Sequence, residues 1–148
     1  MYEHLLVPVD GSELSNKAIE HAIGLAKMLG AAVTGFTAEP PLPVLVVEQA
    51  AVAYDVATFQ EHEKRCEAHA REILEAFAAK AKEAGVQFDG QFMITDNVQQ
   101  GIVDTAQRQG CDLIVMATHG RHGMDALIHG SLAKSVLAHS KLPLLILH

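Results

Sequence analysis

The chain has 148 residues, of which 49% are hydrophobic and 20% charged, and its formal net charge is −7. A chain of this length and composition can bury a full core, which excludes an intrinsically disordered protein. The negative charge argues against general affinity for nucleic acids or anionic membranes, so a phosphate ligand would have to be held locally, by backbone amides or a metal ion.

The first half of the chain alternates between strand-like and helix-like segments. Residues 4–9 form a short apolar run typical of a buried strand, and turn residues end it. Ser15 is the predicted N-cap of a helix that stops at Gly30. Residues 32–37 predict a second strand. Three prolines then interrupt the pattern, and no element is assigned to residues 39–54.

The second half of the chain continues this alternation. From about residue 55 to residue 84 the spacing of apolar residues predicts a long helix that Gly85 ends. The core face of this helix would carry Phe59, Ile73, Leu74, Phe77 and Ala81. The later elements are a strand at residues 86–94, a helix at 98–109, a strand at 113–116, a helix at 132–140 and a strand at 142–147.

Five strands that alternate with helices of this length predict a parallel sheet with helices on both faces. Right-handed crossovers make such a sheet doubly wound, so we expect a three-layer α/β/α fold. Ligands of these folds bind beyond the carboxyl ends of the strands, where the strand order reverses. The first and fourth predicted strands end at Asp10 and Ala117, and polar turn chemistry is found at these two places.

The loop after the fourth strand contains Gly120, and Gly130 and Ser131 open the last helix. Glycines let a backbone approach a ligand closely, and the free N–H groups in a helix's first turn can bind a phosphate. Two structures explain this pattern equally well. One is a phosphate-binding loop with donors from Ser131 and Leu132, and the other is an ordinary loop with a Gly-Ser cap that binds no ligand. Neither a Walker A loop nor the dinucleotide fingerprint is present.

The other polar residues near this edge also have two interpretations each. Asp10 could accept a hydrogen bond from a ribose or base, or act as an outer ligand of a phosphate-bound Mg²⁺, but an Asp before a glycine more often opens a turn. His119, His122 and His129 could donate to phosphate or exchange protons near neutral pH, with Arg121 beside them. We favour exposed loop positions for His122 and His129 and leave His119 open.

A further group of candidate ligands lies on the long predicted helix. His62, Cys66 and His69 occupy positions i, i+4 and i+7, so they share one helix face that could hold a metal. Charged residues surround them, which favours a solvated face instead. The sequence shows no nucleophile, general base and orienting residue at a spacing that indicates a catalytic triad. We therefore assign no catalytic residue, and we assign no metal ligand either.

The sequence carries no pattern of a membrane or exported protein. No run reaches the roughly 18 apolar residues of a membrane helix, and residues 1–5 lack the features of a signal peptide. Cys66 and Cys111 lie far apart in unlike contexts, so a structural disulfide is not expected in a reducing compartment. We therefore expect a cytoplasmic protein.

Several motifs, taken in order, resemble the universal stress protein family over essentially the whole chain. Residues 7–12 are similar to the opening strand and turn of that family, and residues 112–121 to its fourth strand and loop. Residues 130–133 and the closing run 142–147 also fit. The resemblance implies one domain spanning residues 1–148, with a Rossmann-like fold of the adenine nucleotide alpha hydrolase type.

The nucleotide-binding branch of that family carries the motif Gly-x2-Gly-x9-Gly-Ser/Thr. Aligned with it, Gly120 is the second glycine and Gly130 and Ser131 close the motif, but Ala117 replaces the first glycine. If that position needs a positive φ or a very close approach of the ligand, the alanine methyl costs affinity. If its φ is negative, the alanine is harmless.

By this resemblance the ligand is ATP or a related adenine nucleotide, held with Mg²⁺, in a regulatory protein of stress tolerance. Members of the family often dimerise through the last strand, and the apolar run 142–147 suits a homodimer of this kind. The implied site consists of Pro8, Val9 and Asp10 at the adenine and ribose end, Thr37 beside the base, Met116 and Ala117 facing the ribose, and Gly120, Gly130, Ser131 and Leu132 at the phosphates.

Two other functions are compatible with the same residues. The substitution at Ala117 motivates a family member that has lost nucleotide binding and acts as a protein-interaction module. The third function is that of a nucleotide hydrolase or transferase that uses His119 or Asp10. Any hydrolysis would be slow, because no positioned base is visible.

Overall fold

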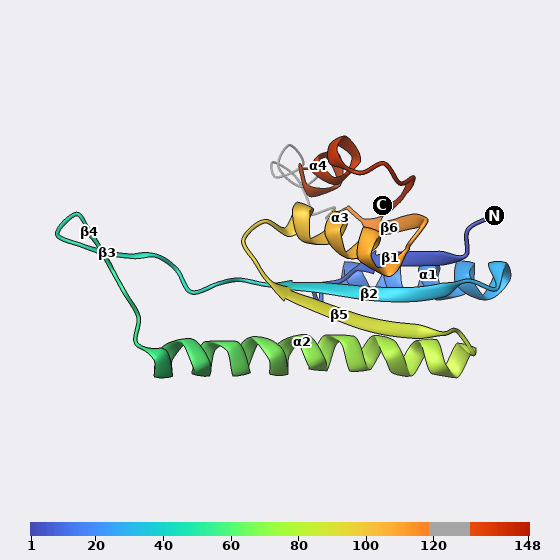
Figure 1. Ribbon diagram of the computed structural model, residues 1–148. Coiled ribbons are helices and arrows are strands. Elements are labelled where there is room, and N and C mark those ends of the chain that lie inside the picture. Colours follow the sequence, from blue (N-terminus) through green and yellow to red (C-terminus); the bar gives the residue numbers. More distant parts are fainter. Residues whose placement is uncertain (119–130) are drawn as a thin grey trace.

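Five parallel strands form the central sheet of the structure, a computed structural model that describes residues 1–118 and 131–148. They are β1 (His4–Pro8), β2 (Ala32–Glu39), β5 (Phe88–Ile94), β6 (Leu113–Ala117) and β7 (Leu144–Leu147). Their order across the sheet is β5-β2-β1-β6-β7, and each neighbouring pair runs parallel. The strand order therefore reverses between β1 and β6 (Figure 1), which confirms the predicted α/β fold with a parallel sheet.

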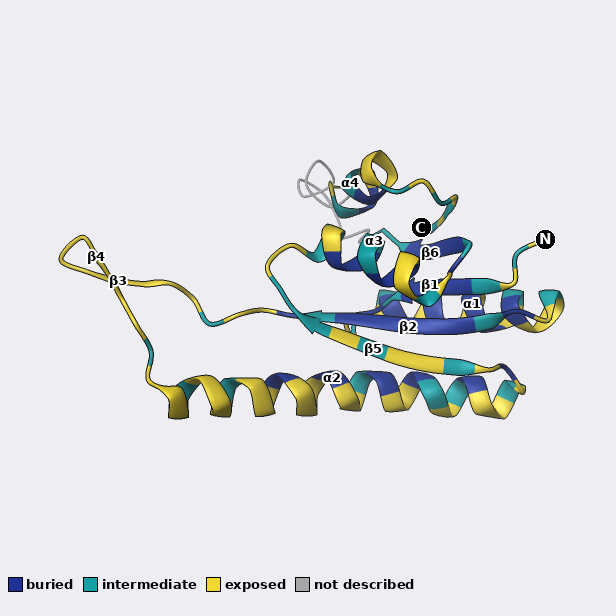
Figure 2. Ribbon diagram, viewed as in Figure 1, coloured by how far each residue is buried: buried dark blue, intermediate teal, exposed yellow. Residues whose placement is uncertain are grey.

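In the described part of the chain, two helices cover each face of this sheet (Figure 1). α1 (Glu13–Leu29) and α2 (Val56–Ala84) pack on one face, and α3 (Val98–Gln109) and α4 (Ser131–His139) pack on the other. Side chains of β1 alternate between the two cores, because Leu5 and Val7 pack with α1 and α2 whereas Leu6 packs with α3 and α4. Figure 2 shows buried residues concentrated in β1 and β2, at the centre of the three layers.

The start of α1 differs from the prediction. Ser12, not Ser15, is the N-cap, because its backbone is extended and its hydroxyl accepts a hydrogen bond from the Ser15 amide at 3.1 Å. The helix therefore begins at Glu13, and Ser15 is buried in its first turn. There the Ser15 hydroxyl accepts a hydrogen bond from the Asp10 amide at 3.1 Å. The predicted stops at Gly30 and Gly85 are confirmed, since both are left-handed C-caps.

Residues 39–54, which the sequence pattern leaves unassigned, include an antiparallel hairpin of β3 (Leu45–Val47) and β4 (Ala50–Val52). The hairpin projects away from the sheet, beyond the first turns of α2 (Figure 1). The prediction that Phe59 lies on the core face is wrong, because this end of α2 extends past the sheet and leaves the side chain 49% exposed. The buried residues of α2 are Cys66, Ala70, Leu74, Phe77 and Ala81, and Ile73 packs against the same core.

Gly35 in β2 is required by close packing. A Cβ atom at this position would lie 2.9 Å from the Phe77 ring and 2.9 Å from the Phe88 ring. Gly35→Ala is therefore expected to lower the free energy of unfolding by about 1–3 kcal/mol, measured by urea denaturation. Gly24→Ala is the matched control, since a Cβ at Gly24 in α1 meets nothing within 4 Å. It should raise stability by up to about 1 kcal/mol, and equal losses in both variants would contradict the packing explanation.

Across the described residues, no helix combines the length and the apolar character that a membrane crossing demands.

Candidate functional site

A cavity opens beyond the carboxyl ends of β1 and β6, where the strand order of the sheet reverses. Its walls come from both of these strands, from the first turn of α1, from the end of β2 and from the starts of α3 and α4. The described residues that line it are Pro8, Val9, Asp10, Ser15, Phe36, Ala38, Val98, Met116, Ala117 and Leu132. Six of the ten residues expected at a ligand site from the sequence therefore line one cavity.

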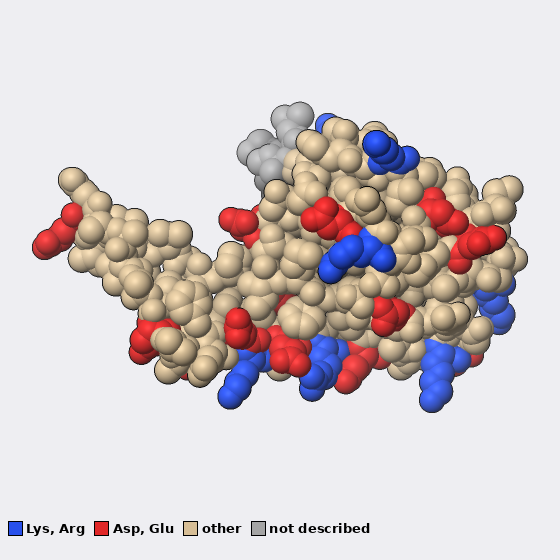
Figure 3. All heavy atoms as spheres, viewed as in Figure 1, with Lys and Arg blue, Asp and Glu red and all other residues tan. Residues whose placement is uncertain are grey.

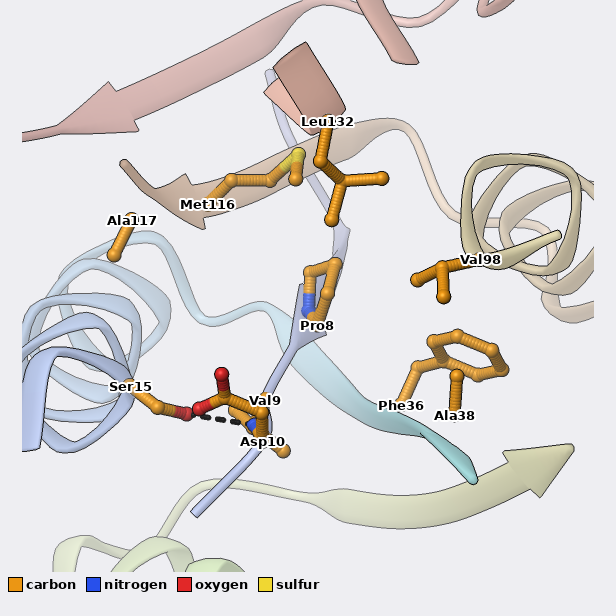
Figure 4. Close-up of a pocket in the computed structure, with 10 residues that line it drawn as sticks. All are labelled: Pro8, Val9, Asp10, Ser15, Phe36, Ala38, Val98, Met116, Ala117 and Leu132. Atoms are coloured by element: carbon orange, nitrogen blue, oxygen red, sulfur yellow. Dashed lines mark hydrogen bonds between the residues drawn. The ribbon is translucent and has the colours of Figure 1, made fainter. Parts of the chain in front are cut away.

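The cavity has an apolar end and a polar end. Figure 4 shows Phe36, Ala38 and Val98 grouped on one side, while Asp10 and Ser15 lie together on another. Among the described lining residues Asp10 carries the one ionisable side chain. An apolar slot with a few polar groups at one end is the usual construction of a small-molecule site.

Asp10 opens a turn and also lies in the wall of the cavity. One of its carboxylate oxygens accepts a hydrogen bond from the Ser12 amide at 2.9 Å, which makes Asp10 a turn-opening residue. The Ser15 hydroxyl holds its backbone amide, as the dashed line in Figure 4 marks. Because the residue also lines the cavity, the turn fixes a carboxylate at the edge of the site rather than competing with it.

The backbone at Ala117 answers the part of the question that concerned its φ angle. Among the described residues, Glu48 and Gln49 are the only non-glycine positions with a positive φ, so the φ of Ala117 is negative. Ala117 is the last residue of β6 and pairs with Leu147 of β7. An alanine adopts this extended conformation without strain, so glycine is not needed there for backbone reasons.

Thr37 does not line the cavity. It is buried in β2, on the same side of the strand as Val33 and Gly35, which face α2. Its neighbours Phe36 and Ala38 point to the other side and reach the cavity instead, because side chains alternate along a strand.

Four lining residues were not predicted from the sequence, namely Ser15, Phe36, Ala38 and Val98. Strand alternation could have identified Phe36 and Ala38 once one residue of β2 was placed toward the site. The sequence contains no comparable signal for Val98, which is brought to the cavity by the start of α3.

The predicted phosphate end is described only in part. Ser131 is the first residue of α4 and is exposed, and Leu132 next to it lines the cavity. The first described turn of α4 thus lies at the rim of the cavity, and the N–H groups of a helix start suit an anion. Gly120 and Gly130 lie outside the described residues, as do His119, Arg121, His122 and His129.

The candidate metal ligands on α2 fix the segment that leaves β2. His62 Nε2 donates a hydrogen bond to the Pro40 carbonyl at 2.8 Å, and Cys66 Sγ lies 3.3 Å from the same nitrogen. His69 Nδ1 lies 2.6 Å from the Glu39 carboxylate. The described residues include no group of three or more side chains that could hold a metal ion. The contacts of His62 and His69 from this helix face hold residues 39 and 40 in place.

Neither cysteine is suited to nucleophilic chemistry. Both are free and buried, in agreement with the expectation that they form no disulfide. Burial raises the pKa of the Cys111 thiol to about 11. Burial, and then the Glu39 carboxylate, raise the pKa of the Cys66 thiol. Both groups are thus uncharged thiols near neutral pH, whereas the thiolate is the reactive form.

Comparison with known proteins identifies relatives along the whole chain. The model of the universal stress protein family matches residues 1–148. A universal stress protein of Methanocaldococcus jannaschii is 27% identical over 146 residues, which cover 99% of this chain and 82% of that protein. The universal stress protein YxiE of Bacillus subtilis is 29% identical over 147 residues, which cover 99% of this chain and 99% of that protein.

Solved structures of the family share the fold. A universal stress protein in complex with cAMP superimposes with a TM-score of 0.72 at 25% identity, over 99% of this chain and 97% of that chain. A family protein of Arabidopsis thaliana with AMP bound superimposes with a TM-score of 0.63 at 15% identity, over 98% of this chain and 90% of that chain.

Proposed function

The chain belongs to the universal stress protein family, and from that membership we propose that it binds ATP or a related adenine nucleotide as a regulatory ligand in stress tolerance. Structural relatives bind the adenine nucleotides cAMP, dAMP and AMP. The observation that carries the proposal is the cavity at the β1–β6 switch point, which joins an apolar slot, a fixed carboxylate and the start of a helix.

The two ends of the cavity suit the two ends of a nucleotide. The apolar end at Phe36, Ala38 and Val98 would enclose the adenine, with Pro8 and Met116 as further apolar contacts. Adenine is flat and largely apolar on its faces, so burial between such side chains is favourable. In this arrangement the base would lie beside β2, as the family resemblance implies, but against Phe36 and Ala38 instead of Thr37.

The polar end would hold the ribose and the phosphates. Asp10, which lines the cavity, would accept a hydrogen bond from a ribose hydroxyl, the role that the family resemblance implies for it. The phosphates would extend toward Ser131 and Leu132 at the start of α4, and toward Gly120 and Gly130. A carboxylate beside phosphates favours a bound cation, and Mg²⁺ usually binds through one or two carboxylates together with phosphate oxygens. Asp10 is the residue that would hold it, directly or through water.

We also propose that the protein is a cytoplasmic homodimer that pairs through β7. This strand lies at one edge of the sheet, and Leu145 and Leu147 line a groove beside it together with Leu25 and Met28 of α1. An uncovered apolar edge strand favours pairing with a second copy. Two free, buried cysteines suit a reducing compartment.

Isothermal titration calorimetry with ATP and Mg²⁺ tests the nucleotide proposal. Wild-type protein should bind, and Ala117→Gly should change the dissociation constant by no more than about threefold, because the φ of Ala117 is negative. Absence of binding heat up to millimolar ATP, with the protein shown to be folded, would refute the proposal. Binding that is present only in Ala117→Gly would instead support a family member that has lost its nucleotide.

A further inference from the structure

Residues 44–53, here called the arm, form the projecting hairpin of β3 and β4, and every one of them is exposed. The strands of the arm pack chiefly on each other, and neither makes extensive contact with another helix or strand of the described chain. Large apolar side chains nevertheless cover the arm and continue onto the first turns of α2. They are Val44, Leu45, Val46, Val47, Val52, Val56 and Phe59.

The base of the arm is held in place by side chains. The Tyr54 hydroxyl donates a hydrogen bond to the Pro43 carbonyl at 2.6 Å, and the Tyr54 ring packs edge-on against Phe59 with centroids 5.7 Å apart. Behind it, His62 binds the Pro40 carbonyl and His69 binds Glu39. These contacts hold the base of the arm in place, whereas residues 44–53 themselves are exposed.

The tip of the arm is conformationally costly. β3 and β4 are joined by the two residues Glu48 and Gln49, with φ values of 49° and 67°. Two-residue hairpin turns with positive φ strongly favour Asn and Gly, and here neither residue is of that kind. An isolated two-stranded hairpin is at best marginally stable in water. A surface that covers the arm would offset the cost of this turn.

We propose that the arm is an interface between two copies of this chain, in which each arm packs on the arm and the first turns of α2 of the other copy. The arm contains one charged residue, Glu48 at its tip, and no cation. Figure 3 shows the projecting segment as mostly uncharged, in contrast to the charged surface along α2. A nearly uncharged apolar surface suits a two-fold interface, in which each patch must complement itself.

The available area agrees with a stable pair. From their exposed fractions, the seven apolar side chains present on the order of 600 Å² per copy. Those of the hairpin lie on both of its faces, because Leu45, Val47 and Val52 share one face and Val44 and Val46 the other. Two copies that wrap around each other and cover both faces would bury up to about 1,200 Å², the lower end of specific interfaces. The outer backbone edges of β3 and β4 are open to pair with the other arm as well.

This interface is separate from the β7 edge and from the nucleotide cavity. The arm leaves the sheet at the end of β2, beside the edge strand β5, whereas β7 forms the opposite edge. A chain that uses both surfaces would assemble into more than a dimer. The proposal does not depend on nucleotide binding.

Sedimentation velocity of the full chain over a wide range of concentrations tests the proposal, with the matched variants Val46→Glu and Leu137→Glu. The two side chains are similarly exposed, at 63% and 58%, but Leu137 lies on α4 far from the arm in sequence. Val46→Glu should halve the mass of the wild-type assembly, because it places two carboxylates in an apolar interface. Leu137→Glu should keep the wild-type mass, and unchanged circular dichroism should show that both variants are folded.

Cross-linking gives a second measurement that does not require a destabilising charge. Both native cysteines are buried, so a bis-maleimide reagent should join copies of Val46→Cys but not copies of Leu137→Cys. If the wild-type protein is monomeric at all concentrations, the proposal is wrong, and the partner of the arm would have to be a different protein. An assembly that survives Val46→Glu but is halved by Leu145→Glu would also overturn it, since the β7 edge alone would then account for the mass.

Discussion

Ala38→Trp is expected to raise the dissociation constant for ATP with Mg²⁺ at least about 100-fold, equivalent to about 2.7 kcal/mol. Ala38 is partly buried near the end of β2 and lines the apolar end of the cavity beside Phe36 and Val98 (Figure 4). An indole at this position would occupy the space proposed for the adenine. Isothermal titration calorimetry measures the loss directly.

The controls for this variant separate occlusion from misfolding. Ala79→Trp places the same side chain on the exposed face of α2 and should bind as the wild type does. Thr37→Val changes the neighbouring residue on the other side of β2 and should also leave affinity unchanged. If folded Ala38→Trp binds the nucleotide with wild-type affinity, the adenine does not lie between β2 and α3.

Phe77→Ala is expected to lower the free energy of unfolding by about 3–5 kcal/mol. Phe77 on α2 is completely buried, and its ring packs against Phe88 of β5 with centroids 4.6 Å apart. It also fills the space that Gly35 leaves open in β2. Truncation would leave a cavity bounded by two strands and a helix, which cannot collapse without moving the sheet. Urea denaturation at a fixed protein concentration measures the change.

Phe92→Ala provides the comparison within the same layer. Phe92 lies on β5 as Phe88 does, but its side chain is 42% exposed. Phe92→Ala should lower the free energy of unfolding by less than about half as much as Phe77→Ala does, because part of the Phe92 ring is already in water. Equal losses in the two variants would contradict the placement of Phe77 at the centre of this core.

Part of the site could be predicted from local sequence patterns. Asp10 and Ala117 follow from two strands that end in polar turn residues, whereas Pro8, Val9 and Met116 are implied by the family resemblance. Parallel strands place their carboxyl ends at one edge, so the two segments must meet if the strands are neighbours. The pattern could not show that Ser12 caps α1, because Ser12 and Ser15 are equally good capping residue types.

The sequence by itself determined the order and type of the main elements, the parallel sheet, and the edge of the sheet at which the cavity lies. These properties depend on the spacing of apolar residues and on turn residues within each segment, which are local. The tertiary structure alone decided that Ala117 has a negative φ, that Phe36 and Ala38 rather than Thr37 line the cavity, and that residues 44–53 project as an arm. Each of these depends on which distant segment packs against the residue, and no local pattern contains that information.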